Sequence, residues 1–246
     1  MPPRFRIATY NIHKGVQGIG LTRRLEIHNL ALAVAQFDAD LICLQEVRAF
    51  NHLQARRFEH WPEEGQADYL APEGYTPVYR TNAVTRHGEH GNALLSRWPV
   101  LAHAHENISD HRFEQRGLLH VTVQVQTRDI HVIVVHLGLL PASRVRQMGQ
   151  LTRYIAREVP VDMPLVVAGD FNDWGNTVTH MMAGLGLHLH RPHGRSTPTF
   201  PSRLPLAQLD HVYARGIQAV HSFTPQGAVW ARMSDHLPLL VDFEWA

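Results

Sequence analysis

Polar residues with the chemistry of a catalytic site follow four apolar, strand-like runs of the sequence. They are Asn11, Glu46, His136 and Asp170. Ligands of open α/β sheets bind at the carboxyl ends of the strands, where such residues would meet. A single strand that ends in a polar residue can simply be reaching solvent. Four of them together favour a shared site at the edge of a sheet.

Two more carboxylates, Asp210 and Asp235, stand late in the chain within the apolar segments QLDHVY and SDHLP. A buried carboxylate is costly unless it is paired, so convergence of these acids with those at the strand ends would require a cation. Mg²⁺, which takes one or two carboxylates and keeps several waters, is the natural partner. His136 and His236 are too few and too interleaved with oxygen donors to suggest zinc. Neutral histidine better suits phosphate contact or proton transfer.

Alternating strand-like and helix-like segments must position these residues. Strands are expected over residues 5–11, 41–46, 75–79, 92–96, 118–125, 130–136, 165–168, 209–213, 219–223 and 239–243. Helical spacing of apolar residues predicts one helix over 27–34 and another that begins near Pro141 and ends at Pro160. Two stretches, 52–74 and 185–205, are expected to be long loops. The excess of strands favours one or two mixed sheets flanked by helices.

The chain has 246 residues, with 23 Lys and Arg against 22 Asp and Glu, and a net charge of +1. Without a linker-like segment, it is expected to form a single domain over residues 1–246. Cys43 is the only cysteine, which excludes an internal disulfide framework and favours a cytoplasmic location. The strand-like run that starts near Phe5 leads us to expect no signal peptide, and no apolar run approaches the roughly 18 residues of a membrane span. The scattered basic residues argue mildly against a non-specific duplex nuclease.

Seven short blocks occur in an order that is typical of one known family. They are TYNIH at 9–13, LQEV at 44–47, GNALLSR at 91–97, VHL at 135–137, GDFND at 169–173, LDHV at 209–212 and SDHLP at 234–238. In these blocks the sequence resembles the endonuclease/exonuclease/phosphatase (DNase I-like) superfamily, and especially its short, uncharacterised bacterial members. The resemblance implies a four-layer α/β sandwich, in which two mixed, mostly antiparallel sheets pack together and are flanked by helices.

The resemblance also implies a metal ion, Mg²⁺ with Mn²⁺ as a substitute. Glu46 would be its main ligand, with Asn11 and Asp235 at or near the metal.

Five catalytic residues are implied in the same way, namely His136, Asp170, Asn172, Asp210 and His236. Asp170, with Asn172 beside it, would orient or deprotonate the attacking water. His236 would contact the phosphate or share in activating that water, while Asp210 holds its imidazole. His136 would contact the phosphate or act as general acid. Family members differ in which group is acid and which is base, so both assignments stay open.

Three further residues are candidates for substrate binding. Arg116 falls where several members of the family carry a phosphate-contacting arginine, although an ordinary surface arginine is an equal alternative. Lys14, the only lysine, stands three residues after Asn11 and could reach a phosphate as a point charge. Asn92 precedes a strand of the family pattern and could line the substrate cleft.

These observations predict a Mg²⁺-dependent phosphoesterase, most simply a phosphodiesterase that cleaves a P–O bond by in-line attack of water. Its partner would be a phosphate-ester substrate of the phospholipid, inositol or nucleic-acid type. Peripheral lipid contact is allowed, and no obligate protein partner is implied. The alternatives are a DNA endonuclease or exonuclease proper, and a catalytically silent binding module. A histidine-rich metal buffer is rejected, since the 19 histidines are spread along the chain.

Overall fold

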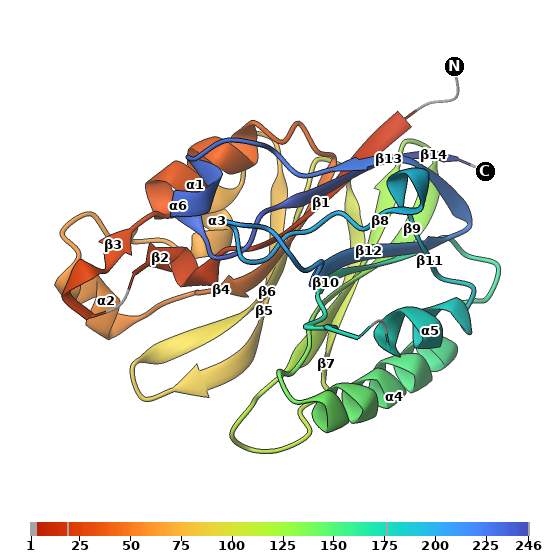
Figure 1. Cartoon of the computed structure of the whole chain (residues 1–246), viewed down its shortest axis with the longest axis horizontal. Helices are drawn as coiled ribbons and strands as arrows, with labels where there is room; N and C mark the ends of the chain where they lie inside the picture. The colour runs from red at the N-terminus through yellow and green to blue at the C-terminus, as the bar shows by residue number, and fades with distance from the viewer. Residues whose placement is uncertain (1–3, 19, 176, 246) are drawn as a thin grey trace.

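Two six-stranded mixed sheets pack face to face, and helices cover both outer faces (Figure 1). This computed structural model describes residues 4–18, 20–175 and 177–245. The predicted four-layer α/β sandwich is therefore confirmed, with two central sheet layers and two outer helical layers. None of the described helices is long and apolar enough to span a membrane.

The first sheet has the strand order β13-β14-β1-β4-β6-β5. Its strands are β1 (Arg4–Asn11), β4 (Leu41–Val47), β5 (Thr76–Thr85), β6 (Gly88–Ser96), β13 (Ile217–Phe223) and β14 (Leu239–Trp245). Neighbours are antiparallel except for β1 and β4, which run parallel with Asn11 opposite Gln45. The carboxyl ends of β1 and β4 therefore meet at one edge, as the sequence predicts.

The second sheet has the strand order β11-β12-β10-β9-β8-β7. Its strands are β7 (Val100–Asn107), β8 (Gly117–Val125), β9 (Arg128–His136), β10 (Leu165–Asp170), β11 (His188–Leu189) and β12 (Asp210–Arg215). Only β9 and β10 run parallel among these described strands. Each sheet thus has one parallel pair, whose carboxyl ends carry polar residues.

Alternation of side chains along the strands divides the interior into three layers. Ile7 faces the other sheet and packs with Val132 and Val166, whereas the neighbouring Ala8 and Ile133 face the outer helices. Burial of each Val, Leu or Ile side chain contributes about 1.5–3 kcal/mol. Because these strands are buried on both faces, they carry apolar side chains on both faces, and the sequence shows continuous apolar runs there.

Helices cover the outer face of each sheet. The first sheet packs against α1 (Ile27–Ala35), α3 (Gln66–Leu70) and α6 (Trp230–Met233). The second packs against α4 (Pro141–Glu158) and α5 (Thr177–Ala183). A short two-stranded ribbon of β2 (Val16–Gln17) and β3 (Arg24–Leu25) lies near α2 (His52–Arg57). One-turn helices are formed by His13–Gly15, Gly20–Thr22 and Pro192–Gly194.

The expected loop over 52–74 was wrong, whereas the expected loop over 185–205 is confirmed apart from two short elements. The stretch 52–74 contains α2 and α3, and 185–205 contains β11 and the turn at Pro192–Gly194. The side chain of Asn51 caps α2 by accepting a hydrogen bond from the backbone of Gln54 at 2.9 Å, a local signal that short helices depend on. The sequence also failed to predict β7, an edge strand whose residues are mostly exposed and show no apolar alternation.

Candidate functional site

Three adjacent strands of the second sheet bring acid and imidazole groups together at one edge. Asp170, the last residue of β10, stands in register with His136 at the end of β9 and with Asp210 at the start of β12. All three side chains are at least nine-tenths buried. The register of the strands, and not a loop conformation, therefore fixes their relative positions.

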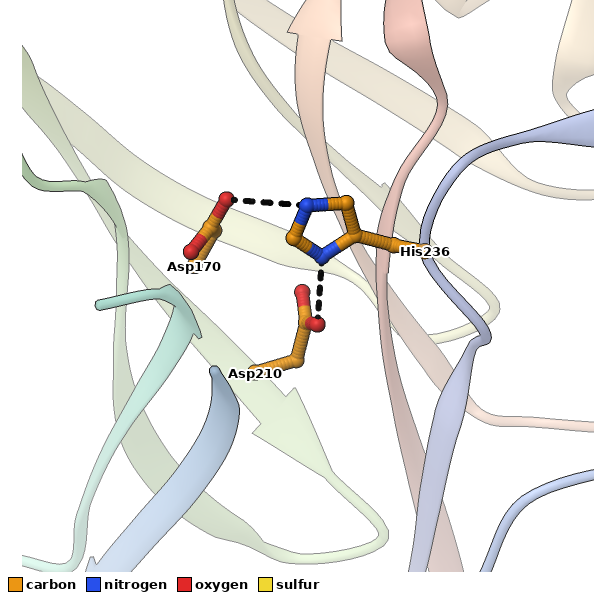
Figure 2. A group of neighbouring side chains, drawn as sticks. All are labelled: Asp170, Asp210 and His236. Carbon is orange, nitrogen blue, oxygen red and sulfur yellow. Dashed lines mark hydrogen bonds and ion pairs between the residues drawn. The ribbon is translucent and has the colours of Figure 1, made fainter. Parts of the chain in front are cut away.

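His236 approaches this edge from the segment that precedes β14. Its Nδ1 lies 2.7 Å from Oδ2 of Asp210, and its Nε2 lies 3.6 Å from Oδ2 of Asp170. Figure 2 shows the imidazole between the two carboxylates. The ring of Phe200 lies against it, with centroids 4.9 Å apart. Asp210 therefore orients the imidazole, and the opposite ring nitrogen faces Asp170.

The two partners of this group have shifted pKa values. Burial alone would lower the pKa of His236, but the carboxylates of Asp210 and Asp170 outweigh it and raise the pKa. Burial raises the pKa of Asp170, and the nearby His236 offsets only part of that effect. The site therefore retains a proton on the imidazole while keeping a carboxylate of raised basicity beside it.

His136 shows the opposite effect, although it also stands beside Asp170, with Nε2 at 3.5 Å from Oδ2. Burial lowers its pKa well below the ordinary value, and the positive charge of Arg116 lowers it further. His136 is therefore held neutral, which leaves it able to donate from one ring nitrogen and accept at the other.

Two asparagines fix the carboxylate of Asp170. Asn11 Nδ2 donates to Oδ2 at 3.0 Å, and the backbone N–H of Asn172 donates to Oδ1 at 3.0 Å. Asn172 has a φ of 49°, in the left-handed region that asparagine tolerates better than most residues, and its Nδ2 donates to the carbonyl of Leu137. Asn11 thereby links the end of β1 in the first sheet to β10 in the second.

The predicted metal ligands lie at the end of the first sheet. Glu46 occupies a bulge of β4 with a φ of 58°, and its Oε2 lies 2.7 Å from Nζ of Lys14. Burial raises the pKa of Glu46, but the positive charge of Lys14 is the largest of the effects that outweigh it, so the pKa is lowered. Asp235 Oδ1 lies 3.1 Å from Nδ1 of His13. Both carboxylates are thus held ionised, as ligands of a hard cation must be.

A second group brings two further carboxylates together around the protonated imidazole of His236. One ligand atom from each of Asp170, Asp210 and His236 lies within 4.8 Å of the others. Oxygen donors dominate both this group and the pair Glu46 and Asp235, and such donors fit a hard divalent ion. The residues present are therefore compatible with the expected metal.

The three predicted substrate-binding residues occupy different positions. Lys14 lies at the site, paired with Glu46. Arg116 is largely buried close to His136, with Nη2 at 3.6 Å from Oε1 of Glu114, and its Nε has no hydrogen-bond partner among the described residues. Asn92 is fully buried in β6, where its Nδ2 donates at 3.0 Å to the carbonyls of Gly117 and Val134. Asn92 thus braces β8 and β9, and contact of any of the three with substrate stays a prediction.

Sequence reasoning missed Phe200, Arg48 and Gln66 around the site. Phe200 covers His236, and the ring of Trp174 lies edge-on to Phe200 with centroids 5.8 Å apart. Arg48 and Gln66 lie beside Glu46 and Lys14. Arg48 stands only two residues after Glu46, which was a usable signal, whereas the roles of Phe200 and Gln66 depend on contacts between distant segments.

A family profile matches nearly the whole chain, including the residues of this site. The profile of the "Endonuclease/Exonuclease/phosphatase family" matches residues 8–236. The chain belongs to this family. Family members are generally hydrolases of phosphate esters, they include phosphodiesterases and nucleases, and they typically use a divalent metal.

Relatives of the same family match along most of the chain. The chain is 36% identical to "Uncharacterized protein YbhP" of Escherichia coli (strain K12) over 241 residues, which is 96% of this chain and 94% of that protein. This relationship agrees with the expected bacterial branch of the endonuclease/exonuclease/phosphatase family.

Solved structures support the same fold. The human Nocturnin catalytic domain with bound sulfate anion aligns with a TM-score of 0.75 at 21% identity, over 99% of this chain and 94% of that one. The endonuclease/exonuclease/phosphatase from Beutenbergia cavernae gives 0.72 at 21% identity, over 99% and 72%. D. rerio TDP2 complexed with single strand DNA product gives 0.66 at 14% identity, over 98% and 99%.

Proposed function

We propose that the protein is a Mg²⁺-dependent phosphodiesterase that cleaves a P–O bond by in-line attack of water. The observation that carries the proposal is the contact of His236 with Asp210 at 2.7 Å, placed 3.6 Å from Asp170 in the same buried group. A carboxylate, an imidazole and a second carboxylate at these distances can take a proton from water and stabilise a phosphoryl group.

Asp170 is the proposed base. Its raised pKa makes its carboxylate more basic than an exposed aspartate at neutral pH, which favours proton transfer from the attacking water. The hydrogen bonds from Asn11 and Asn172 hold both of its oxygens in place. Asp170 therefore acts from a fixed position.

His236 is the proposed donor to the phosphoryl group. Asp210 binds its Nδ1, so the proton on Nε2 is directed away from Asp210 and toward the side of Asp170. A charged imidazole there stabilises negative charge that develops on the phosphoryl oxygens. His136, held neutral, is suited to donate a hydrogen bond to the ester on the same edge.

Glu46 and Asp235 would hold the metal, with Asn11 nearby. When bound, Mg²⁺ would supply Lewis-acid stabilisation of the phosphoryl oxygens. The family's general use of a divalent metal and the ionised state of Glu46 both support this assignment. We prefer Mg²⁺, with Mn²⁺ as a substitute, because all the proposed ligands are oxygen donors.

The substrate is proposed as a phosphodiester of the phospholipid, inositol or nucleic-acid type. The net charge of +1 disfavours non-specific binding of duplex DNA, which depends on many phosphate contacts. No obligate protein partner is proposed. A cytoplasmic location remains our proposal from the single cysteine.

The test is hydrolysis of bis(p-nitrophenyl) phosphate by the purified protein with Mg²⁺ or Mn²⁺. We expect activity that EDTA abolishes and that falls on the order of 10²–10⁴-fold in His236→Ala. His188→Ala, which changes an exposed histidine of β11 opposite the far end of β12, is the matched control and should match the wild type. Activity that survives both EDTA and His236→Ala would refute the proposal.

A further inference from the structure

A pocket of about 190 Å³ opens beside Glu46, between the turn at His13–Gly15 and the end of β4. We name it the basic pocket, after its lining residues His13, Lys14, Arg23, Arg48 and Gln54. A water takes about 30 Å³ in the liquid, so this volume holds roughly six waters. It is therefore large enough for one phosphoryl group and a few waters.

The charge of the basic pocket is strongly positive. Three of its lining side chains, Lys14, Arg23 and Arg48, are cationic, and no carboxylate is among the described residues that line it. Lys14 is paired with Glu46, which lies just outside. Arg23 is exposed and forms no ion pair with any described residue. The pocket thus has positive charge beyond what Glu46 neutralises.

Arg48 is the least satisfied of these groups. Its Nη1 is buried and has no hydrogen-bond partner among the described residues. A buried guanidinium donor without an acceptor is costly, so an anionic ligand would repay this cost directly.

Gln54 adds a second unsatisfied atom. Gln54 is buried, and its Oε1 has no hydrogen-bond partner among the described residues. A half-turn of the amide exchanges this oxygen for an N–H donor, since the two ends of the group have nearly the same shape. The basic pocket therefore offers a neutral donor beside its cations.

A buried glutamine holds the pocket's two key segments in place. Gln66 Nε2 donates to the carbonyl of Lys14 at 2.9 Å, and its Oε1 accepts from the backbone N–H of Arg48 at 2.9 Å. Gly15, with a φ of +70°, passes so close that a Cβ there would lie 2.7 Å from Gln66 Nε2. The main chains that carry Lys14 and Arg48 are thus fixed relative to each other, as a preorganised binding site requires.

The basic pocket adjoins the proposed catalytic site through shared residues. His13 and Lys14 line the pocket and also pair with Asp235 and Glu46, respectively. A ligand in the pocket would therefore lie next to the phosphoryl group that the proposed site attacks. Of the three lining cations, Lys14 alone has an ion-pair partner among the described residues, so neutralising Glu46 does not account for Arg23 and Arg48.

We propose that the basic pocket binds a second phosphoryl group of the substrate, adjacent to the phosphate that is cleaved. This inference rests on the proposed function for the identity of the neighbouring site. It narrows the substrate class to molecules with two phosphoryl groups, one of them the scissile diester and the other a terminal or branching phosphate.

The experiment is an equilibrium titration by calorimetry, at fixed ionic strength and in EDTA. The ligands are propane-1,3-diol bisphosphate and, for comparison, propyl phosphate, with the two-carbon and four-carbon bisphosphates to measure the spacing. We expect the best bisphosphate to bind about 10–100-fold more tightly than propyl phosphate, the range for added charge-assisted hydrogen bonds.

Three variants locate this preference. Arg48→Gln should reduce it to about unity, and Arg23→Gln should reduce it severalfold. Arg56→Gln removes an exposed arginine of α2 that does not line the pocket, and should leave it unchanged. If Arg48→Gln fails to fold, as judged by circular dichroism, the comparison of Arg23→Gln with Arg56→Gln tests the proposal instead, because both arginines are exposed.

The inference is overturned if the wild type binds all these ligands equally or not at all. It is also overturned if Arg56→Gln lowers the preference as much as the pocket variants, since a general positive field would then explain it. The titration needs no turnover. A preference for bisphosphates that depends on Arg48, without any hydrolysis of diesters, would support the binding role of the pocket and refute the proposed phosphodiesterase activity. Hydrolysis of diesters without this preference would support the activity and refute the binding role.

Discussion

Two buried histidines on opposite sides of the second sheet behave in opposite ways. His236, at the catalytic edge, is 5% exposed and lies between Asp210 and Asp170. His120, under α4, is 7% exposed and contacts Tyr154 Oη at 3.0 Å and His131 Nδ1 at 2.8 Å. The pKa of His236 is raised, whereas that of His120 is lowered to about 4.

The difference shows what controls protonation in this protein. Burial lowers the pKa in both places, because it penalises the charged imidazole. Only the carboxylates reverse the direction at His236. His136 lies near Asp170 but also near Arg116, and its pKa is lowered. A histidine here keeps its proton only where nearby carboxylates outweigh both burial and cations.

Asp210→Asn is the strongest way to break the contrast. It removes the charge of the carboxylate in closest contact with His236. The pKa of His236 should therefore fall, in the direction of the lowered pKa of His120. We expect kcat on bis(p-nitrophenyl) phosphate to fall on the order of 10²–10⁴-fold with the fold intact. Steady-state kinetics, circular dichroism and an NMR titration of His236 measure these effects. An unchanged kcat would exclude the orienting role of Asp210.

Glu46→Gln tests the proposed metal ligands separately from the group of His236, Asp210 and Asp170. It should weaken Mg²⁺ binding by at least about 10–100-fold, the range known for groups that only support a metal ligand. Activity titrated against Mg²⁺ concentration measures the shift, with Glu63→Gln, an exposed glutamate, as the control. An unmoved Mg²⁺ midpoint would show that Glu46 is not a ligand.

His120→Gln tests the other side of the contrast through pH. The pKa of His120 is about 4 in the fold and near 6.5 in the unfolded chain, so the unfolded chain takes up the proton first. Stability should fall as the pH drops from about 6.5 to about 4. The free energy of unfolding of the variant should fall by about 1–2 kcal/mol less than that of the wild type over this pH range, a value reduced to allow for screening by solvent.

Thermal unfolding at pH 7 and pH 4 measures this difference. For a chain of this length, 1 kcal/mol corresponds to about 2–4 °C in Tm. His188→Gln, at an exposed position, should follow the wild type. Equal acid losses in His120→Gln and the wild type would show that His120 is not held neutral.

Tyr154→Phe is expected to have the smallest effect. It removes the hydroxyl that contacts His120 Nδ1 and leaves the ring packed under α4. The loss of one hydrogen bond should cost about 1 kcal/mol at pH 7, or about 2–4 °C in Tm. A Tm identical to that of the wild type would mean that this hydroxyl does not contribute to the histidine pair.

The sequence predicted the central strands and the polar residues at their ends. Runs such as 130–135 and 165–168 are apolar on both faces because helices and the other sheet cover them, and this pattern is visible without a structure. The resemblance supplied the pairing of Asp210 with His236. The single domain over 1–246 remains a prediction, although the family profile spans 8–236.

Other features could not be predicted, for physical reasons. The edge strand β7 is mostly exposed and carries no apolar alternation, and α2 and α3 are too short to show helical periodicity. The basic pocket brings together residues 14, 23 and 48, and Gln66 of α3 holds the backbone of two of them, Lys14 and Arg48. The pKa shifts depend on which charges meet in space, and composition carries no information about that.

The pairing of β1 with β14 has a consequence for how the chain is made. Arg4 pairs in register with Glu244, and β1 lies between β14 and β4 in the middle of the first sheet. Because β1 and β14 stand far apart in the sequence, β1 must wait until β14 has been made before its sheet can close. Until then β1 offers an open edge, which is the kind of surface on which nascent chains aggregate or bind chaperones. Synthesis of β14 is thus the step that completes the sheet carrying Asn11 and Glu46.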